Sequence, residues 1–86
     1  MPRAVSMRHT AVASGDREDF RVRARESRDH YANAGCRYWL YEEDHLPGAF
    51  VEFFEASDQD TLTSAHRGAQ GAAHQSSRVY LEVELR

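Results

Sequence analysis

Two neighbouring segments of this chain, residues 36–43 and 49–56, carry large apolar side chains at consecutive positions. Both are rich in aromatic residues, which favours β-strands. Successive side chains of a strand point to opposite faces of its sheet, so apolar groups occupy both faces of these two strands. An antiparallel sheet with one face in water normally alternates apolar and polar residues, so we expect both faces to be covered. In the first segment Tyr38 and Leu40 oppose Trp39 and Tyr41, and in the second Phe50 and Phe54 oppose Val51 and Phe53.

Between these strands, residues 44–48 predict a turn, because Pro47 presets its own backbone angle and Gly48 accepts a positive φ. The two strands therefore form a hairpin. Residues 16–34 predict a helix with Asp16 as its N-cap, and Gly35 follows where a left-handed residue commonly ends a helix. One face of this helix carries Phe20, Ala24, Ser27, Tyr31 and Ala34.

A second, shorter helix is predicted over residues 57–67, with a loop or a frayed extension of it over residues 68–77. Residues 5–12 favour a strand, and residues 78–85 alternate between apolar and polar side chains, as a strand does. The shared face of the second helix carries Leu62, Ala65 and His66, and one face of the last strand carries Val79, Leu81, Val83 and Leu85.

The resulting order, β-α-β-β-α-β, is that of a ferredoxin-like α+β sandwich, here a single domain over residues 1–86. Two helices cover only one face of such a sheet. The simplest cover for the second apolar face is another copy of the chain, so we expect a symmetric homodimer. Dimerisation through a strand edge would leave that face uncovered.

Composition excludes several classes of protein. The formal net charge is −3, which argues against a general affinity for nucleic acid or anionic membranes. No apolar run approaches the roughly 18 residues that span a bilayer, and no apolar stretch follows the N-terminal charges as in a signal peptide. Cys36 is the single cysteine, so no internal disulfide can form, and a reducing cytoplasm is the expected compartment.

The same order of elements describes the RNA-recognition motif, and residues 49–53 match the end of its third-strand signature. The start of that signature would fall on residues 46–48, which lack its basic residue and one of its aromatic rings. The first strand also offers no aromatic platform on which bases would stack. We therefore interpret the match as a coincidence of strand composition.

A better resemblance covers most of the chain. The first helix ends in Ala34-Gly35-Cys36, the hairpin ends in Phe53-Phe54-Glu55, and the second helix ends in Ser64-Ala65-His66-Arg67. In this order and spacing, these segments resemble the antibiotic-biosynthesis-monooxygenase-like family of dimeric α/β barrels. The resemblance implies that two ferredoxin-like domains join into one barrel. It also implies cofactor-independent oxygenation of an aromatic or quinol-type small molecule.

The chain departs from that family in three places, the first being the twelve residues from Phe54 to His66, which exceed the family's spacing and require an insertion. Catalytic members tend to carry Trp near the end of the third strand, where this chain has Phe53 and Phe54, and its only tryptophan is Trp39. Haem-degrading relatives carry an Asn early in the first strand, and no Asn precedes Asn33 here, so haem is not an expected substrate. The missing third-strand Trp favours an alternative function, a non-catalytic ligand-binding or structural barrel.

Two residues are the candidate catalytic groups. His66 shares a helix face with Leu62, from which an imidazole can accept or relay a proton near neutral pH in a cavity between helix and sheet. The alternative is a histidine that hydrogen-bonds a backbone carbonyl in the core or caps the helix. Arg8, or a tyrosine hydroxyl, is expected to hold the oxyanion of a deprotonated phenol.

The expected lining of a pocket for a flat aromatic ligand is Trp39, Tyr41, Phe54 and Tyr80, although aromatic residues on strands also serve as core or dimer contacts. The five histidines, His9, His30, His45, His66 and His74, form no spaced ligand pair, so no metal site is expected. The opposite charges along the first helix are interpreted as a solvated face.

Overall fold

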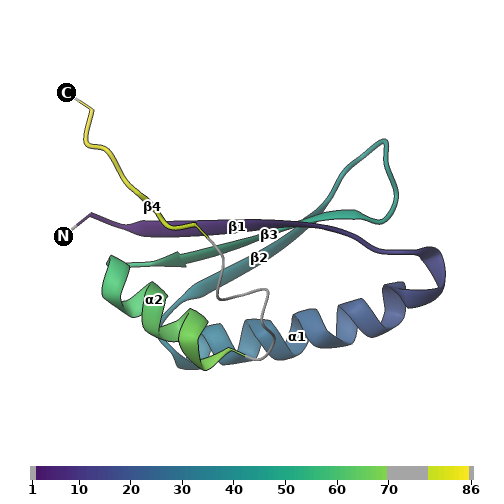
Figure 1. Ribbon diagram of the computed structural model, residues 1–86, viewed down its shortest axis with the longest axis horizontal. Helices are drawn as coiled ribbons and strands as arrows, with labels where there is room; N and C mark the ends of the chain where they lie inside the picture. The colour runs from purple at the N-terminus through teal and green to yellow at the C-terminus, as the bar shows by residue number, and fades with distance from the viewer. Residues whose placement is uncertain (1, 70–77, 86) are drawn as a thin grey trace.

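The computed structural model describes residues 2–69 and 78–85 of the chain. Its elements follow the predicted order (Figure 1). They are β1 (Ala4–Ala11), a short 3-10 turn η1 (Ser14–Asp16), α1 (Arg17–Asn33), β2 (Arg37–Glu42), β3 (Ala49–Ala56), α2 (Gln59–Gly68) and β4 (Tyr80–Leu81). The predicted loop over residues 68–77 lies mostly outside the described residues.

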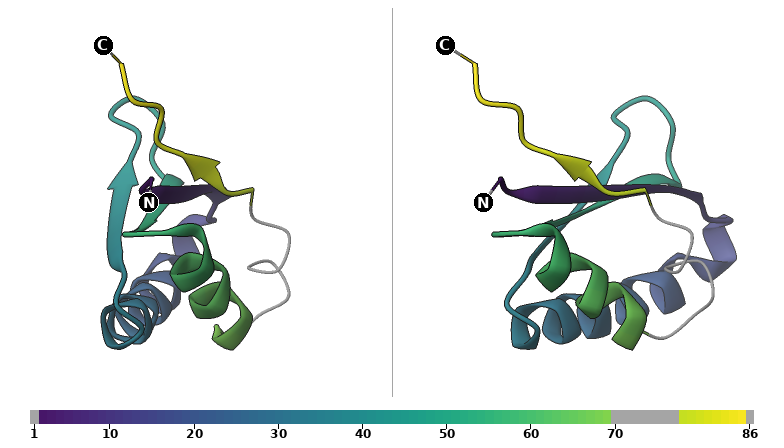
Figure 2. Two further views of the ribbon diagram at one scale, coloured as in Figure 1. Left: turned by 90° about the vertical axis from the view of Figure 1, so that its left-hand side faces the viewer. Right: turned by 60° about the vertical axis from the view of Figure 1, so that its left-hand side comes forward.

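The four strands form one antiparallel sheet in the order β2-β3-β1-β4. Strand β3 is antiparallel to both β1 and β2, so β1 and β2 are parallel to each other with β3 between them. This arrangement is a split βαβ unit. Both helices lie on the same side of the sheet (Figures 1 and 2). The α+β class is confirmed and the topology is compatible with the ferredoxin-like fold, whereas the dimeric barrel stays a prediction.

Helix α1 ends as the sequence predicts. Gly35 has φ +83°, its N–H donates to the carbonyl of Ala32 (3.2 Å), and the N–H of Cys36 donates to the carbonyl of Tyr31 (2.8 Å). This pair of bonds is a Schellman motif, which satisfies carbonyls at the end of the helix. At the other end the prediction is wrong in one respect. Asp16 occupies the N-cap position but makes no capping bond through its side chain, because it closes the preceding 3-10 turn in a helical conformation.

Helix α2 begins after Asp58, whose carboxylate accepts a hydrogen bond from the backbone N–H of Thr61 (2.8 Å). This bond and the positive end of the helix dipole stabilise the ionised carboxylate, and the hydrogen bonds at Thr61 lower the pKa of Asp58. The helix buries the three residues predicted for its inner face, Leu62, Ala65 and His66.

The predicted last strand, residues 78–85, is much shorter than expected. Only Tyr80 and Leu81 pair with β1, and Leu81 already lies opposite Ala4, the first residue of β1. The N–H of Glu82 donates to the carbonyl of Arg3 (2.8 Å), one residue before β1 begins. The alternation therefore continues past the end of its partner strand, and the chain leaves the sheet there (Figures 1 and 2).

The register assigns every sheet residue to one of two faces, because directly paired residues point the same way. We call the face toward the helices the inner face and the opposite one the outer face. The inner face carries Ala4, Ser6, Arg8, Thr10, Tyr38, Leu40, Glu42, Phe50, Glu52, Phe54, Ala56 and Leu81. The outer face carries Val5, Met7, His9, Ala11, Arg37, Trp39, Tyr41, Ala49, Val51, Phe53, Glu55 and Tyr80.

The core lies between the inner face and the helices. It is built from seven buried residues, Ala4, Tyr31, Cys36, Phe54, Ala56, Leu62 and Ala65. Phe54 and Tyr31 pack with ring centroids 4.6 Å apart, and both are fully shielded from solvent. A second contact, between Phe20 and Phe50 at 4.7 Å, closes the opposite end of α1 against β3.

Candidate functional site

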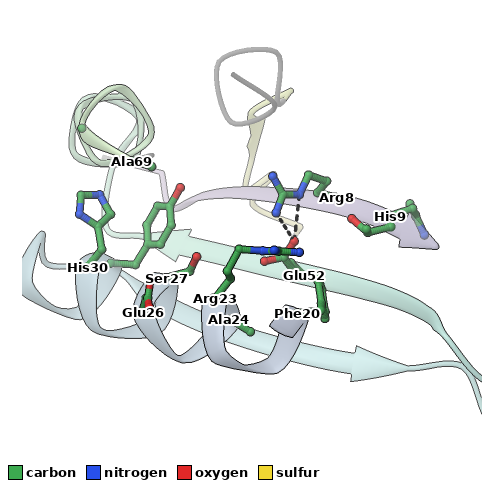
Figure 3. Close-up of a pocket in the computed structure, with 13 residues that line it drawn as sticks. Arg8, His9, Phe20, Arg23, Ala24, Glu26, Ser27, His30, Glu52 and Ala69 are labelled. Atoms are coloured by element: carbon green, nitrogen blue, oxygen red, sulfur yellow. Dashed lines mark hydrogen bonds and ion pairs between the residues drawn. The ribbon is translucent and has the colours of Figure 1, made fainter. Parts of the chain in front are cut away.

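A cavity of about 620 Å³ lies between α1, the inner face and the end of α2. From the sheet it is lined by Arg8 and Glu52, and from the helix by residues spaced along one face. Figure 3 shows the Arg8–Glu52 pair on the sheet, with the α1 residues facing it. The lining residues on α1 are Phe20, Arg23, Ala24, Glu26, Ser27, His30 and Tyr31.

The sheet wall of the cavity is organised around Glu52, whose side chain is almost fully buried. Arg8 lies directly opposite on β1 and donates from both Nε (2.9 Å) and Nη2 to Oε1. Tyr38 on β2 donates its hydroxyl to Oε2 (2.6 Å). Burial and the hydrogen bond to the Glu52 carboxylate raise the pKa of Tyr38 well above its usual range, so this hydroxyl keeps its proton at neutral pH.

Behind the cavity, a chain of three polar side chains crosses the core. Tyr31 Oη lies 2.7 Å from His66 Nδ1, and His66 Nε2 lies 2.9 Å from Ser6 Oγ. Ser6 and Tyr31 are fully buried, and His66 is 5% exposed. Burial also raises the pKa of Tyr31 well above its usual range, although the nearby Arg8 acts in the opposite direction. Of the three, only Tyr31 lines the cavity.

A second histidine lies at the cavity wall. His30 Nε2 is 2.8 Å from the backbone carbonyl of Ala65, which can only accept a hydrogen bond. Nε2 therefore carries a proton, and in the neutral ring the lone pair is on Nδ1. This contact ties α1 to α2 and fixes the orientation of the imidazole.

The structure separates the predicted site residues into two groups. His66 and Phe54 lie together in the core, with ring centroids 5.1 Å apart, and Arg8 lies on the same inner face. Trp39, Tyr41 and Tyr80 lie on the outer face, on the other side of the sheet. The six residues therefore do not line one pocket, and within this chain the inner-face cavity contacts only Arg8 among them.

The sequence analysis missed Glu52, His30 and the pairing of Tyr31 with His66. A signal for Glu52 was present, since it lies two residues from both Phe50 and Phe54 and therefore on their face. A carboxylate on an otherwise apolar strand face requires a buried partner, and Arg8 supplies it. For His30 there was no such signal, because its bond to Ala65 depends on how α1 and α2 pack.

Residues 2–69 and 78–85 contain no group of three or more His, Cys, Asp or Glu side chains that could hold a metal ion. None of the helices formed by these residues has the length and apolar character that crossing a membrane requires.

No protein-family model, curated protein or solved structure matches the chain. The resemblance to the monooxygenase-like family therefore stays a prediction, and the functional argument depends on the geometry of the cavity.

Proposed function

We propose that this protein binds a small phenolic or quinol-type aromatic molecule in the inner-face cavity and oxygenates it without a cofactor. The observation that carries the proposal is the division of the cavity walls. Phe20, Ala24 and Tyr31 line the cavity with apolar groups for a ring, while Arg8 offers a cation for an oxygen. A ligand with a flat apolar body and an ionisable hydroxyl matches both walls.

Oxygenation of such a phenol requires few catalytic groups from the protein. A deprotonated, electron-rich phenol can pass an electron to dioxygen, so the protein has to exclude water and stabilise the phenolate. For an anthrone-like substrate, one methylene and one O₂ become one ketone and one water, which needs no external reductant. Arg8 is the group that stabilises the anionic oxygen, and its own orientation is fixed by the two bonds to Glu52.

A second function, ligand binding without catalysis, is favoured by a specific observation. The charge of Arg8 is already neutralised by Glu52, and both nitrogens of His66 lie within hydrogen-bonding distance of a buried hydroxyl. Polar groups that satisfy one another hold the fold together and do not have to react.

Oxygen uptake by metal-stripped protein, measured against hydroquinones and anthrone, tests the first function. Ser27→Phe fills the cavity from α1, whereas Ala32→Phe places the same ring on the exposed side of that helix as a matched control. We expect uptake by the wild type and the control and a loss in Ser27→Phe. Binding of anthraquinone by calorimetry without oxygen uptake supports the non-catalytic function, and absence of both in the wild type contradicts the site.

We also propose that the outer face forms a homodimer interface with a second copy of the chain. It is rich in aromatic and aliphatic side chains, and Met7 (38%), Tyr41 (56%) and Tyr80 (47%) are substantially exposed. An apolar patch of this kind marks an interaction surface, and a twofold axis would cover the same patch on both copies. Light scattering should give twice 9.8 kDa, and Trp39→Lys should return the protein to 9.8 kDa. A wild type that stays monomeric at micromolar concentration contradicts the interface.

A further inference from the structure

We propose that His66 takes the proton of the bound phenol through Tyr31, so that Tyr31 contacts the substrate and His66 is the base behind it. The inference rests on the proposed function and deepens it. The sequence indicated His66 as a group that accepts or relays a proton, and the structure leaves it out of the lining of the cavity. Tyr31 lines the cavity and lies within hydrogen-bonding distance of His66.

The three-residue chain remains hydrogen-bonded in both protonation states of His66. In the neutral Nε2–H tautomer, which the relay requires, Tyr31 Oη donates to His66 Nδ1 and Nε2–H donates to Ser6 Oγ, at the observed distances. In the protonated state, Nδ1–H donates to Tyr31 Oη and the Nε2 bond is unchanged. A hydroxyl can both donate and accept, so no heavy atom has to move. His30 differs, because its Nε2 faces a carbonyl that accepts only.

The transfer is balanced and moves no electrons to another molecule. The phenol O–H bond breaks as an O–H bond forms at Tyr31 Oη, and the original Tyr31 O–H bond breaks as an N–H bond forms at His66 Nδ1. The products are a phenolate in the cavity and an imidazolium in the core. Tyr31 is neutral before and after the step, which fits its burial, since a buried phenolate at this position is unfavourable.

The charged groups near Tyr31 bear on whether a transient imidazolium at His66 is stable. The ionisable groups that act on Tyr31 from the sheet side are Arg8 on β1, Glu52 on β3 and Cys36 before β2, and His30 is its neighbour on α1. Arg8 and Glu52 form an ion pair and largely cancel. The step itself adds a phenolate in the cavity, whose negative charge attracts the imidazolium.

The test uses p-nitrophenol, a chromophoric phenol whose ionisation is read by absorbance without any oxygenation. Bound to the wild type, it should ionise at lower pH than in water. His66→Gln and Tyr31→Phe should each raise the apparent pKa of the bound probe by about 1 unit relative to the wild type. His45→Gln, in the exposed hairpin turn and outside the cavity, is the matched control and should leave the apparent pKa unchanged.

Nitrogen NMR of the histidines is measured on the wild type, so its result does not depend on whether a variant folds. We expect the Nε2–H tautomer of His66 in the free protein and an imidazolium when p-nitrophenol is bound. A bound probe that leaves His66 neutral overturns the relay alone, as does a pKa shift in His45→Gln in place of His66→Gln. A wild type that does not bind p-nitrophenol overturns the proposed function and the relay together.

Discussion

The inner and outer faces of this sheet share the same strands, and each departs from the usual distribution of polarity. The inner face, covered by two helices, carries the buried polar residues Ser6 and Glu52. The outer face, which no helix covers, carries aromatic side chains, of which Tyr41 is 56% exposed (Figure 2). Buried polar groups are tolerated where each has a partner, and exposed aromatic groups call for one. The inner face is therefore complete within one chain, whereas the outer face lacks a cover among the described residues.

The largest expected difference between the faces comes from two adjacent residues. Phe54 is fully buried on the inner face, and Phe53 is half-buried on the outer face. Phe54→Ala should lower the free energy of unfolding by about 3–5 kcal/mol, because it leaves a cavity in the core. Phe53→Ala should cost about 1 kcal/mol in dilute, monomeric protein. Urea denaturation measures both, and equal losses would contradict the assignment of the two faces.

Phe53 and Phe54 also show which features of the fold can be predicted from the sequence. Alternation along residues 49–56 separated Phe50 and Phe54 from Val51 and Phe53, and the structure confirms that separation. Local signals likewise predicted the end of α1 at Gly35 and the buried face of α2. These features depend on neighbours within a few residues along the chain.

What the sequence could not predict depends on packing between distant segments. The length of β4 was overestimated, because it is limited by where β1 begins rather than by its own alternation. The contacts of His66 were missed for the same reason, since its partners Ser6 and Tyr31 come from β1 and α1. The direction of His66 toward the core was predictable from the helix face, but its hydrogen bonds required the tertiary structure.

The second prediction tests whether the polar inner face depends on pairing. Glu52→Ala should lower the free energy of unfolding by about 2–4 kcal/mol, since it leaves Arg8 without its buried carboxylate. Glu55→Ala, on the outer face of the same strand, should cost about 0.5 kcal/mol or less. The double variant Arg8→Met with Glu52→Leu should recover much of the stability. No recovery would mean that Glu52 acts through Tyr38 more than through Arg8.

The third prediction concerns alkaline pH and the two inner-face tyrosines. Burial raises the pKa of Tyr31 and of Tyr38, so the folded protein retains protons that the unfolded chain releases near pH ~10. Stability is therefore fully present below that pH and should fall above it, by about 1.4 kcal/mol per pH unit for each tyrosine. Tyr38→Phe should reduce the slope of unfolding free energy against pH. An unchanged slope would mean that Tyr38 ionises equally in both states.

The smallest expected effect is on the outer face and depends on protein concentration. Tyr41→Ser removes a ring that is largely exposed in one chain, so in dilute protein it should change the free energy of unfolding by about 0.5 kcal/mol or less. If the outer face is a dimer interface, unfolding is linked to dissociation, and the same substitution becomes more costly as concentration rises. Thermal unfolding over a hundredfold range of concentration measures this. An effect that is small and constant over that range would leave the outer face exposed in solution, and the contrast between the two faces would then be a property of the monomer.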